Sequence, residues 1–488
     1  MCKRLINIIV FAGLCAGLYA QHGPQQYYPE TDPMVLKKLE KWQDLKFGLL
    51  MHWGPYSQWG IVESWSLCSE DVGWTKRTKG RYENYGQYKI DYENLKTTFN
   101  PARFNPQKWA EAARTAGMKY VVFTTKHHDG FCMFDSRYTD YKITDKDCPF
   151  STNPKSNVTK EIFDAFRNEG LWVGAYFSKP DWHCEYYWWP YFSTPDRNVN
   201  YDIEKYPDRW EKFVQYTHNQ IDELMTDYGK VDILWLDGGW VQPYTEQELW
   251  AYRTNKDFKQ FNLQSQDIRM GDIVKKARAK QPGLIVVDRA VEGPYQNYLT
   301  PENRVPERML PYPWESCITM GSGWSYSFDP EFKSSRELIR MLVDIVSKGG
   351  NLLLNIGSSP EGTWDDEAYG RLEEIGRWMN VNGEAIYGSR PIAPYREGRV
   401  CLTKQEDGTV YAIYLGSEDD QSPPSKIWLS SIAPAGSTKI SMLGVDGTLE
   451  WERIGNGFLV DIPKSVQKNP PCSYAWTLKI SGISDLKK

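Results

Sequence analysis

Six short apolar segments alternate with amphipathic helical patterns along most of this chain. The segments are rich in β-branched and aromatic residues and end near turn residues, which is typical of buried strands. They are residues 47–52, 120–125, 172–177, 231–237, 284–288 and 352–356. Because strand and helix alternate from about residue 42 to residue 379, the pattern predicts a parallel α/β fold. We favour a (β/α)8-like barrel over an open doubly wound sheet.

The helical patterns between these segments carry the end signals that helices need. Trp109, Ala113 and Ala116 recur at helical spacing, between a start at Asn105-Pro106 and a stop at Gly117. Further helices are expected at residues 159–167, 210–224 and 334–348. No G-x-G-x-x-G follows the first apolar segment, so dinucleotide binding has no support.

From about residue 391 the pattern changes to short apolar runs separated by turns. Long helical patterns stop, and dipeptides such as Asp407-Gly408 and Asp446-Gly447 separate the candidate strands. This is typical of an antiparallel β-sandwich. The sequence therefore predicts a barrel domain at 21–390 and a β-sandwich domain at 391–488.

Residues 1–20 have the features of a secretory signal peptide. Lys3-Arg4 precedes an apolar stretch, and Ala20 supplies the small residue before the expected cleavage. We expect export to the periplasm or the extracellular space. A lipoprotein signal centred on Cys15 is the weaker alternative, because the bulky Leu14 precedes it. No other stretch is apolar enough to span a membrane, so the mature chain is expected to have no integral membrane segment.

Composition narrows the possible partners. The net charge of −5 and the lack of a basic run argue against nucleic acid or an anionic membrane. The seven cysteines after the signal are sparse and unpatterned, so they predict neither a disulfide scaffold nor a C-x-x-C metal site. Whether any pair forms a disulfide stays open, as does the oligomeric state. Aromatic residues make up 14% of the chain and fit sugar-stacking platforms and a large aromatic core equally well.

The segment that ends at Asp237 carries the leading candidate for chemistry. Side chains alternate along a strand, so Trp235 and Asp237 share one face. A carboxylate on the last residue of a buried strand is held rigidly at the face where a barrel places its active site. From this segment alone, an Asp that only caps the turn at Gly238-Gly239 is equally expected.

Four of the six histidines follow the first three predicted strands. They are His52, His127, His128 and His183. The carboxyl ends of barrel strands share one face, so we expect these side chains near the active site. Adjacent residues on a strand point apart, which argues against a zinc ion shared by His127 and His128. No metal or other cofactor is predicted, and neutral imidazoles that hydrogen-bond sugar hydroxyls fit better.

Several tryptophans fall in the same loops. They are Trp53, Trp65, Trp235, Trp240 and Trp324. For each of them, packing in the core or a loop is as strong an interpretation as contact with a sugar. Together with the acids and histidines, they indicate a carbohydrate pocket.

Four motifs extend this interpretation to a family. They are FGLLMHWGPY at 47–56, TTKHHDGF at 124–131, WLDG at 235–238, and PWESC at 313–317 with GWSY at 323–326. Together they resemble the motifs of the α-L-fucosidases of glycoside hydrolase family 29, over about residues 30–390. The resemblance implies a retaining exo-α-L-fucosidase that acts on fucosylated oligosaccharides or glycoconjugates, with a barrel followed by a C-terminal sandwich.

The resemblance also implies residue roles. Asp237 corresponds to the catalytic nucleophile, and Arg289 to a residue that orients the acid side of the site. The substrate-binding set is His52, Trp53, Glu63, Trp65, His127, His128, Tyr176, Trp235, Arg289 and Trp324. Glu63 and Trp65 are separated by one serine here, whereas many relatives have an adjacent Glu-Trp, so this match is looser.

The general acid/base is assigned from a loop that varies within the family. Glu302, in Leu-Thr-Pro-Glu-Asn, best resembles the family's acid, and Glu292, Glu307 and Glu315 are the alternatives by position. Glu315 is expected to be structural. Two other functions stay open at this point: another exo-glycosidase on the same barrel, such as an α-galactosidase, and a catalytically inactive glycan-binding protein. The sequence does not indicate the linkage cleaved or the natural glycan.

Overall fold

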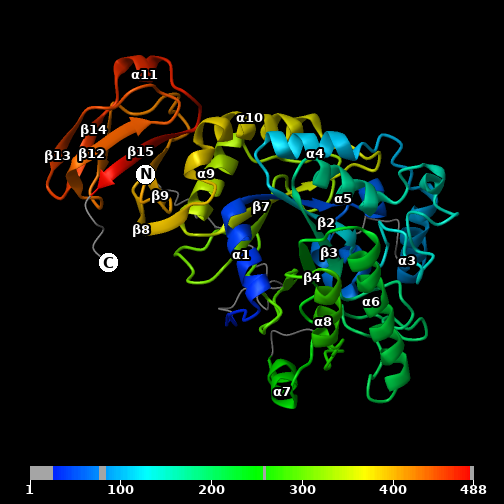
Figure 1. The fold of residues 1–488 in the computed structure, drawn as a ribbon. Coiled ribbons are helices and arrows are strands. Elements are labelled where there is room, and N and C mark those ends of the chain that lie inside the picture. The colour runs from blue at the N-terminus through cyan, green and yellow to red at the C-terminus, as the bar shows by residue number, and fades with distance from the viewer. Residues whose placement is uncertain (1–25, 76–83, 256–259, 484–488) are drawn as a thin grey trace, which may run out of the picture.

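The computed structural model describes residues 26–75, 84–255 and 260–483. The predicted signal peptide, residues 1–20, lies outside them. Within the described residues, the chain forms a parallel seven-stranded sheet wrapped by helices, followed by two antiparallel sheets (Figure 1). The predicted (β/α)8-like barrel followed by a β-sandwich is confirmed.

The parallel sheet has the strand order β5-β4-β3-β2-β1-β7-β6. Its strands are β1 (Phe47–His52), β2 (Tyr120–Lys126), β3 (Trp172–Ser178), β4 (Ile233–Asp237), β5 (Ile285–Asp288), β6 (Glu315–Thr319) and β7 (Asn351–Gly357). The six predicted strands are all present. β6 was not predicted as a strand.

The barrel domain has helices before, between and after the strands of its sheet, and several of them cover the outer face of the sheet (Figure 1). The helices are α1 (Pro33–Leu45), α2 (Val72–Thr75), α3 (Tyr85–Glu93), α4 (Pro106–Thr115), α5 (Val158–Asn168), α6 (Pro207–Asp227), α7 (Glu246–Thr254), α8 (Met270–Lys280), α9 (Ser335–Ser347) and α10 (Asp366–Asn382). The helix starts follow the sequence signals: Asn105 caps α4 through a bond from Lys108 N, and Ser334 caps α9 through a bond from Glu337 N.

The gap between the edge strands β5 and β6 is bridged by residues 296–303. Gln296 bridges to Val287 of β5, and Glu302 bridges in parallel to Cys317 of β6. The barrel interior is filled by side chains from every strand of the sheet. They are Leu50, Tyr120, Val122, Tyr176, Ile233, Trp235, Ile285, Val287, Cys317 and Leu353, joined by Tyr298 of the bridging segment and by Leu39 and Trp42 of α1. The barrel is therefore a packed core whose carboxyl ends are free to carry a site.

The C-terminal domain is a two-sheet sandwich. One sheet has the order β12-β15-β10-β9-β8 and the other β11-β14-β13. The strands are β8 (Arg390–Glu397), β9 (Val400–Lys404), β10 (Val410–Leu415), β11 (Lys426–Leu429), β12 (Pro434–Met442), β13 (Trp451–Ile454), β14 (Gly457–Asp461) and β15 (Ala475–Ile483), with a short helix α11 (Lys464–Lys468). The predicted antiparallel strands are present, and Asp407-Gly408 and Asp446-Gly447 lie between β9 and β10 and between β12 and β13.

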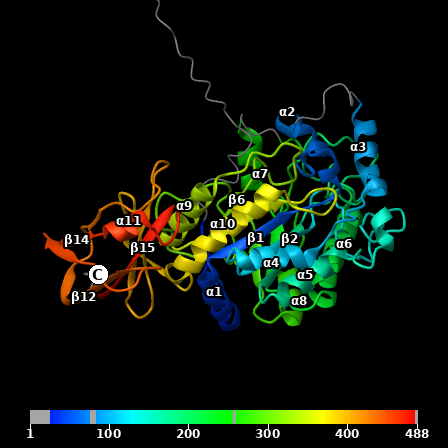
Figure 2. The same ribbon diagram turned by 90° about the horizontal axis from the view of Figure 1, so that it is seen from above.

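The sandwich packs against α9 and α10, on the flank of the barrel (Figures 1 and 2). Side chains alternate along β10, so Tyr411 and Ile413 join the barrel's hydrophobic core while Val410 and Ala412 face the sandwich core. A hydrogen bond from Nε1 of Trp378 in α10 to the carbonyl oxygen of Ala475 in β15 (2.9 Å) also holds the two domains together. Among the described residues, no helix is long and apolar enough to cross a membrane.

Candidate active site

Asp237 lies at the carboxyl end of β4, at the mouth of the barrel. Ile233 and Trp235 of the same strand point into the barrel interior, so the alternation carries Asp237 to the same face. The chain then turns at Gly238, whose φ is 89° and whose position would bring a Cβ within 2.3 Å of Pro180. Only glycine fits there without strain. Its backbone N–H donates to Oδ1 of Asp237 over 2.8 Å.

Two further side chains donate to the Asp237 carboxylate. The Tyr176 hydroxyl donates to Oδ2 over 2.7 Å, and Nη1 of Arg289 donates to Oδ1 over 3.0 Å. Burial raises the pKa of Asp237, but the charge of Arg289 and the hydrogen bonds from Tyr176 and Gly238 outweigh this effect and lower the pKa well below its usual range. Asp237 is therefore held as a carboxylate.

The same Arg289 guanidinium reaches a second carboxyl group. Its Nη2 donates to Oε2 of Glu302, while its Nη1 holds Asp237. A planar guanidinium has a fixed fork of donors, so the two carboxyl groups are held at a set spacing on either side of it. The sequence placed Arg289 on the acid side of the site, and the structure puts it between the two acids.

The alternative acids lie elsewhere. Glu292 and Glu307 are exposed, and Oε1 of Glu292 accepts a bond from the Gln26 backbone N–H. Glu315 lies inside the barrel, where the Tyr120 hydroxyl donates to it over 2.5 Å and burial raises its pKa to about 7. Of the four predicted candidates, Glu302 is the one that shares a guanidinium with Asp237.

His52 ends β1 and is oriented by a residue that the sequence analysis missed. Its Nδ1 lies 2.7 Å from Oδ1 of Asn355, and Nδ2 of Asn355 donates to the carbonyl oxygen of Trp324 over 2.7 Å. Because Asn355 presents its acceptor, Nδ1 of His52 carries the proton and Nε2 is left as an acceptor. Burial lowers the pKa of His52 to about 4. Asn355 lies near the carboxyl end of β7, two residues before Gly357, and a polar residue at that point of an apolar run was the signal available in the sequence.

The rings of His127 and His128 lie next to each other, which corrects the expectation that they point apart. Their ring centres are 4.3 Å apart, because β2 ends at Lys126, after a register shift against β3. Both residues have left the strand, so the alternation rule no longer applies to them. Burial lowers the pKa of His128 to about 3 and that of His127 well below its usual range, so both rings are neutral.

The two rings differ in their partners. Ser64 hydrogen-bonds Nδ1 of His127. Neither ring nitrogen of His128 has a hydrogen-bond partner, although its Nε2 lies 3.9 Å from Oδ2 of Asp237. A buried imidazole with two free nitrogens is poised to bond a ligand. His183 lies apart from this set, because its Nδ1 bonds Glu93 and its ring stacks on Tyr141.

Two clusters of side chains in the described residues have the spacing of metal ligands. One is His127, His128 and Asp237, and the other is Cys68, Glu70 and Asp71, each with ligand atoms within 4.8 Å of one another. Each cluster already has a guanidinium on its carboxylates: Arg289 binds Asp237, and Arg197 binds both Glu70 and Asp71. A divalent cation would have to compete with a buried positive charge in either place.

Aromatic rings form the walls around these groups. Trp65 meets His128 edge-on at 4.9 Å, and Trp240 does so at 5.2 Å. Tyr176 stacks on Trp235 at 5.2 Å, while Trp324 lies 5.3 Å from His52. Trp53 is the exception among the predicted tryptophans. It is buried among Phe99, Phe104 and Trp109 on the helix side of the sheet, so the structure assigns it to packing behind the site.

Glu63 adds a third carboxyl group. It is buried, and neither of its carboxyl oxygens has a hydrogen-bond partner. Burial, with the nearby charges of Glu302 and Asp237, raises the pKa of Glu63 to about 8. Glu63 is therefore protonated at neutral pH and has an unused donor.

Comparison with known proteins identifies the family. The family model described as "Alpha-L-fucosidase" matches residues 15–384, and "Alpha-L-fucosidase C-terminal domain" matches residues 396–481. The chain belongs to the α-L-fucosidase family. It is accordingly a glycoside hydrolase, and the fucosidase predicted from the motifs is confirmed.

Relatives of this fucosidase cover its whole length. It is 28% identical to the tissue α-L-fucosidase of Homo sapiens over 98% of this chain and 97% of that one. In structure it resembles α-L-fucosidase isoenzyme 1 of Paenibacillus thiaminolyticus, with a TM-score of 0.71, 27% identity, and coverage of 93% of this chain and 100% of that one. A family 29 α-L-fucosidase of Bacteroides thetaiotaomicron, trapped as a covalent intermediate, shares the fold with a TM-score of 0.69 and 23% identity, covering 94% of this chain and 100% of that one.

Proposed function

We propose that this fucosidase retains anomeric configuration, with Asp237 as the nucleophile and Glu302 as the general acid/base. The observation that carries the proposal is the Arg289 guanidinium, which binds both carboxyl groups at once. In retaining glycosidases the two carboxyl groups are only about 5–5.5 Å apart, whereas inverting enzymes leave room for a water between them. A single guanidinium bridging both groups fits the closer spacing.

In the first step, an Asp237 oxygen attacks the anomeric carbon of the fucosyl group. The bond from that carbon to the leaving oxygen breaks, and Glu302 gives its proton to this oxygen. The charge of Arg289 and the bonds from Tyr176 and Gly238 keep Asp237 ionised and aimed, which a nucleophile needs. The product of this step is a fucosyl ester on Asp237.

In the second step, water attacks the same carbon while Glu302 takes its proton. The ester bond breaks and the Asp237 carboxylate is restored. Each step inverts the anomeric carbon, so the overall result is retention. Neutral His52 and His128 and the protonated Glu63 supply acceptors and donors for the fucose hydroxyls. The tryptophans around His128 exclude water and pack on the apolar side of the sugar.

We further propose that the substrates are fucosylated oligosaccharides or glycoconjugates, and that the protein is exported after cleavage of residues 1–20. The charged start and apolar stretch of those residues support export. N-terminal sequencing of the protein secreted by the native cell should begin at Gln21. A mature chain that retains Met1 would contradict export by this signal.

Two measurements test the proposed chemistry. Proton NMR during cleavage of an α-fucoside should show α-fucose as the first product, and β-fucose first would contradict retention. Mass spectrometry after treatment with 2-deoxy-2-fluorofucosyl fluoride should find the fluorofucosyl group on the peptide that contains Asp237. Labelling of a different carboxylate would remove Asp237 from the nucleophile's role.

A further inference from the structure

We propose that Trp74 is a platform for the sugar ring that carries the fucose. Trp74 lies in α2, and 51% of its surface is exposed. A single exposed tryptophan is ordinary on a protein surface. Its fixed orientation and its place next to the pocket wall distinguish this one. The inference rests on the proposed fucose site at Asp237.

Trp74 is the outermost ring of a row that starts at the candidate nucleophile. His128 lies 3.9 Å from Asp237, Trp65 is 4.9 Å from the His128 ring, and Trp74 is 6.1 Å from Trp65. The rings of Trp65 and Trp74 are tilted by 48°, and exposure increases outward along the row. We place the sugar next to fucose one ring farther out along this row, against Trp74, with the fucose beside Trp65.

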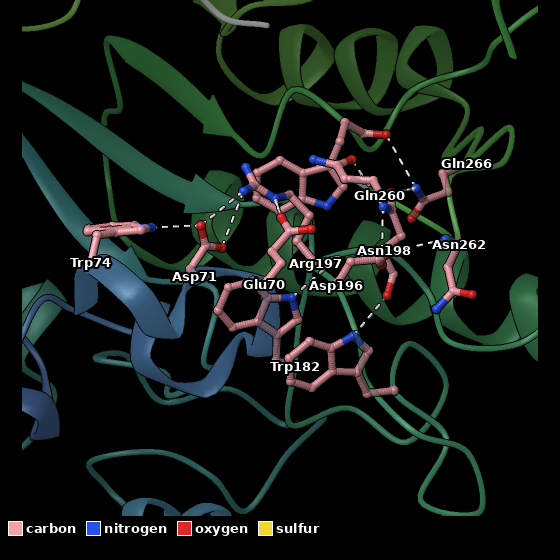
Figure 3. Close-up of polar contacts among 12 residues, drawn as sticks. Glu70, Asp71, Trp74, Trp182, Asp196, Arg197, Asn198, Gln260, Asn262 and Gln266 are labelled. Atoms are coloured by element: carbon pink, nitrogen blue, oxygen red, sulfur yellow. Dashed lines mark hydrogen bonds and ion pairs between the residues drawn. The ribbon is translucent and has the colours of Figure 1, made fainter. Parts of the chain in front are cut away.

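The indole nitrogen of the exposed Trp74 is held by a buried carboxylate. Its Nε1 donates to Oδ1 of Asp71 over 2.8 Å, and Nη2 of Arg197 donates to both oxygens of Asp71 over 3.3 and 3.2 Å (Figure 3). Asp71 is itself buried. The polar edge of Trp74 is therefore fixed while half of its surface stays exposed, and this fixed orientation lowers the entropy lost when a ligand packs on it.

The pair of Asp71 and Arg197 connects to three loops at the mouth of the barrel. The side chain of Arg197 holds Asp71, and its backbone carbonyl oxygen accepts a hydrogen bond from Nε1 of Trp182 over 3.2 Å. Its neighbour Asp196 accepts from the backbone N–H of Asn262 over 2.8 Å (Figure 3). The loops after β1, β3 and β4 are thus tied together at Arg197. A platform on this network is held as firmly as the pocket itself.

The ligand class follows from the chemistry of the indole. A hexopyranose such as galactose presents a face of C–H groups, and that face packs on an aromatic ring by dispersion and burial of apolar surface. The occupant is the pyranose linked to fucose in the substrate. It leaves with the glycosidic oxygen when the bond is cleaved, so Trp74 acts on binding of the leaving sugar.

The test compares substrates with and without that sugar. Fucosyl fluoride has the same fucose and no leaving sugar, whereas fucosyl-galactose and fucosyl-N-acetylglucosamine disaccharides have one. Trp74→Ala should lower kcat/KM on the best-cleaved disaccharide by roughly 5- to 10-fold, mainly through KM, as expected for losing one aromatic stack. It should leave fucosyl fluoride turnover and inhibition by free fucose unchanged. Trp74→Phe should retain most of the disaccharide activity.

A matched control is Trp428→Ala, which removes a 59% exposed tryptophan from β11 of the sandwich. It should leave kcat/KM unchanged for both fucosyl fluoride and the disaccharide. If Trp74→Ala lowered kcat/KM equally for the fluoride and the disaccharide, Trp74 would act on the fucose site itself. If it lowered kcat/KM for no disaccharide, Trp74 would not be a platform for the leaving sugar. The proposed nucleophile fails separately, if Asp237→Gly still turns over fucosyl fluoride, so the two failures are distinguishable.

Discussion

Arg289 donates from Nη1 to Oδ1 of Asp237 over 3.0 Å, and its other terminal nitrogen is bound to Glu302. This cation has two effects on the site. It keeps Asp237 ionised although the residue is buried, and it sets the spacing between the two carboxyl groups.

Asp237→Gly should keep the fold and lose nearly all turnover, about 10³-fold or more, because no other side chain can form the fucosyl ester. Azide is small enough to occupy the vacated space, so it should partly restore cleavage of an aryl fucoside with an acidic phenol. The measurement is steady-state kinetics with and without azide, beside a thermal melt. Near-normal turnover without azide would remove Asp237 as the nucleophile.

Glu302→Gln should lower the rate of cleavage most for substrates with poor leaving groups. A general acid is needed for natural oligosaccharides, whereas acidic phenols leave unaided. Azide should attack the covalent intermediate in place of water, and this second inversion should give α-fucosyl azide, which has the configuration of the substrate. The control is Glu315→Gln, which removes a buried partner of Tyr120 inside the barrel. It should lower the melting temperature and slow both substrates together. The same leaving-group dependence at Glu315, or at Glu292, would overturn the assignment of Glu302.

The fold and the position of Asp237 were predicted from the sequence because their signals are local, whereas Glu302 was assigned only through the resemblance to the family. A buried strand needs apolar residues at a period that the chain displays, and Asp237 follows such a strand directly. The sequence did not predict β6, because Glu315-Ser-Cys-Ile-Thr has an acidic residue where an apolar side chain is expected. The structure shows why this is tolerated: Glu315 lies beside Tyr120 in the barrel interior.

Other features depend on tertiary contacts that the sequence does not display. Asn355 is part of an apolar run in the sequence, and its role follows from the hydrogen bond between its side chain and His52. The rings of His127 and His128 lie together because the register of β2 shifts before Lys126, which no pattern in the sequence marks. Trp53 follows His52 directly, yet its side chain goes to the opposite side of the sheet, as alternation requires.

His52→Ala and His128→Ala should each lower kcat/KM for fucosides by roughly 10²-fold, or about 3 kcal/mol, because a site built to bond hydroxyls strengthens those bonds in the transition state. Asn355→Ala should give a smaller loss of the same kind, since it removes the acceptor that sets the His52 tautomer. A chelator should have no effect. Activity lost with chelator and restored with zinc would make His127, His128 and Asp237 a metal site.

Arg197→Gln should lower kcat/KM by roughly 10-fold, because the Arg197 guanidinium packs 4.9 Å from Trp65 and 5.3 Å from Trp240, the two rings against His128. The matched control is Arg278→Gln, which removes an ion pair with Glu30 away from these rings. Both variants should melt at lower temperature, but only Arg197→Gln should lose activity. In a Trp65→Ala background its effect should shrink, and additive losses would show that Arg197 does not act through Trp65.

Glu63 should make stability and activity depend on pH. Its pKa rises from 4.5 to about 8 in the folded protein, first through burial and then through the charges of Glu302 and Asp237. Between these two values the folded state holds a proton that the unfolded state has released. The contribution of Glu63 to the free energy of unfolding is therefore at its maximum below pH 4.5, and it is lost as pH rises to about 8.

Glu63→Gln removes this titration while keeping a neutral group of the same shape. Its melting temperature relative to that of the unmodified protein should therefore rise as pH increases from 4.5 to 8. Its kcat/KM should fall less steeply above pH 8 than that of the unmodified protein, because no carboxylate forms beside Asp237 there. The control is Glu292→Gln, an exposed carboxyl that should leave both profiles unchanged. Parallel pH profiles for Glu63→Gln and the unmodified protein would mean that Glu63 is ionised in the folded state, and its role as a hydrogen-bond donor to fucose would then fall.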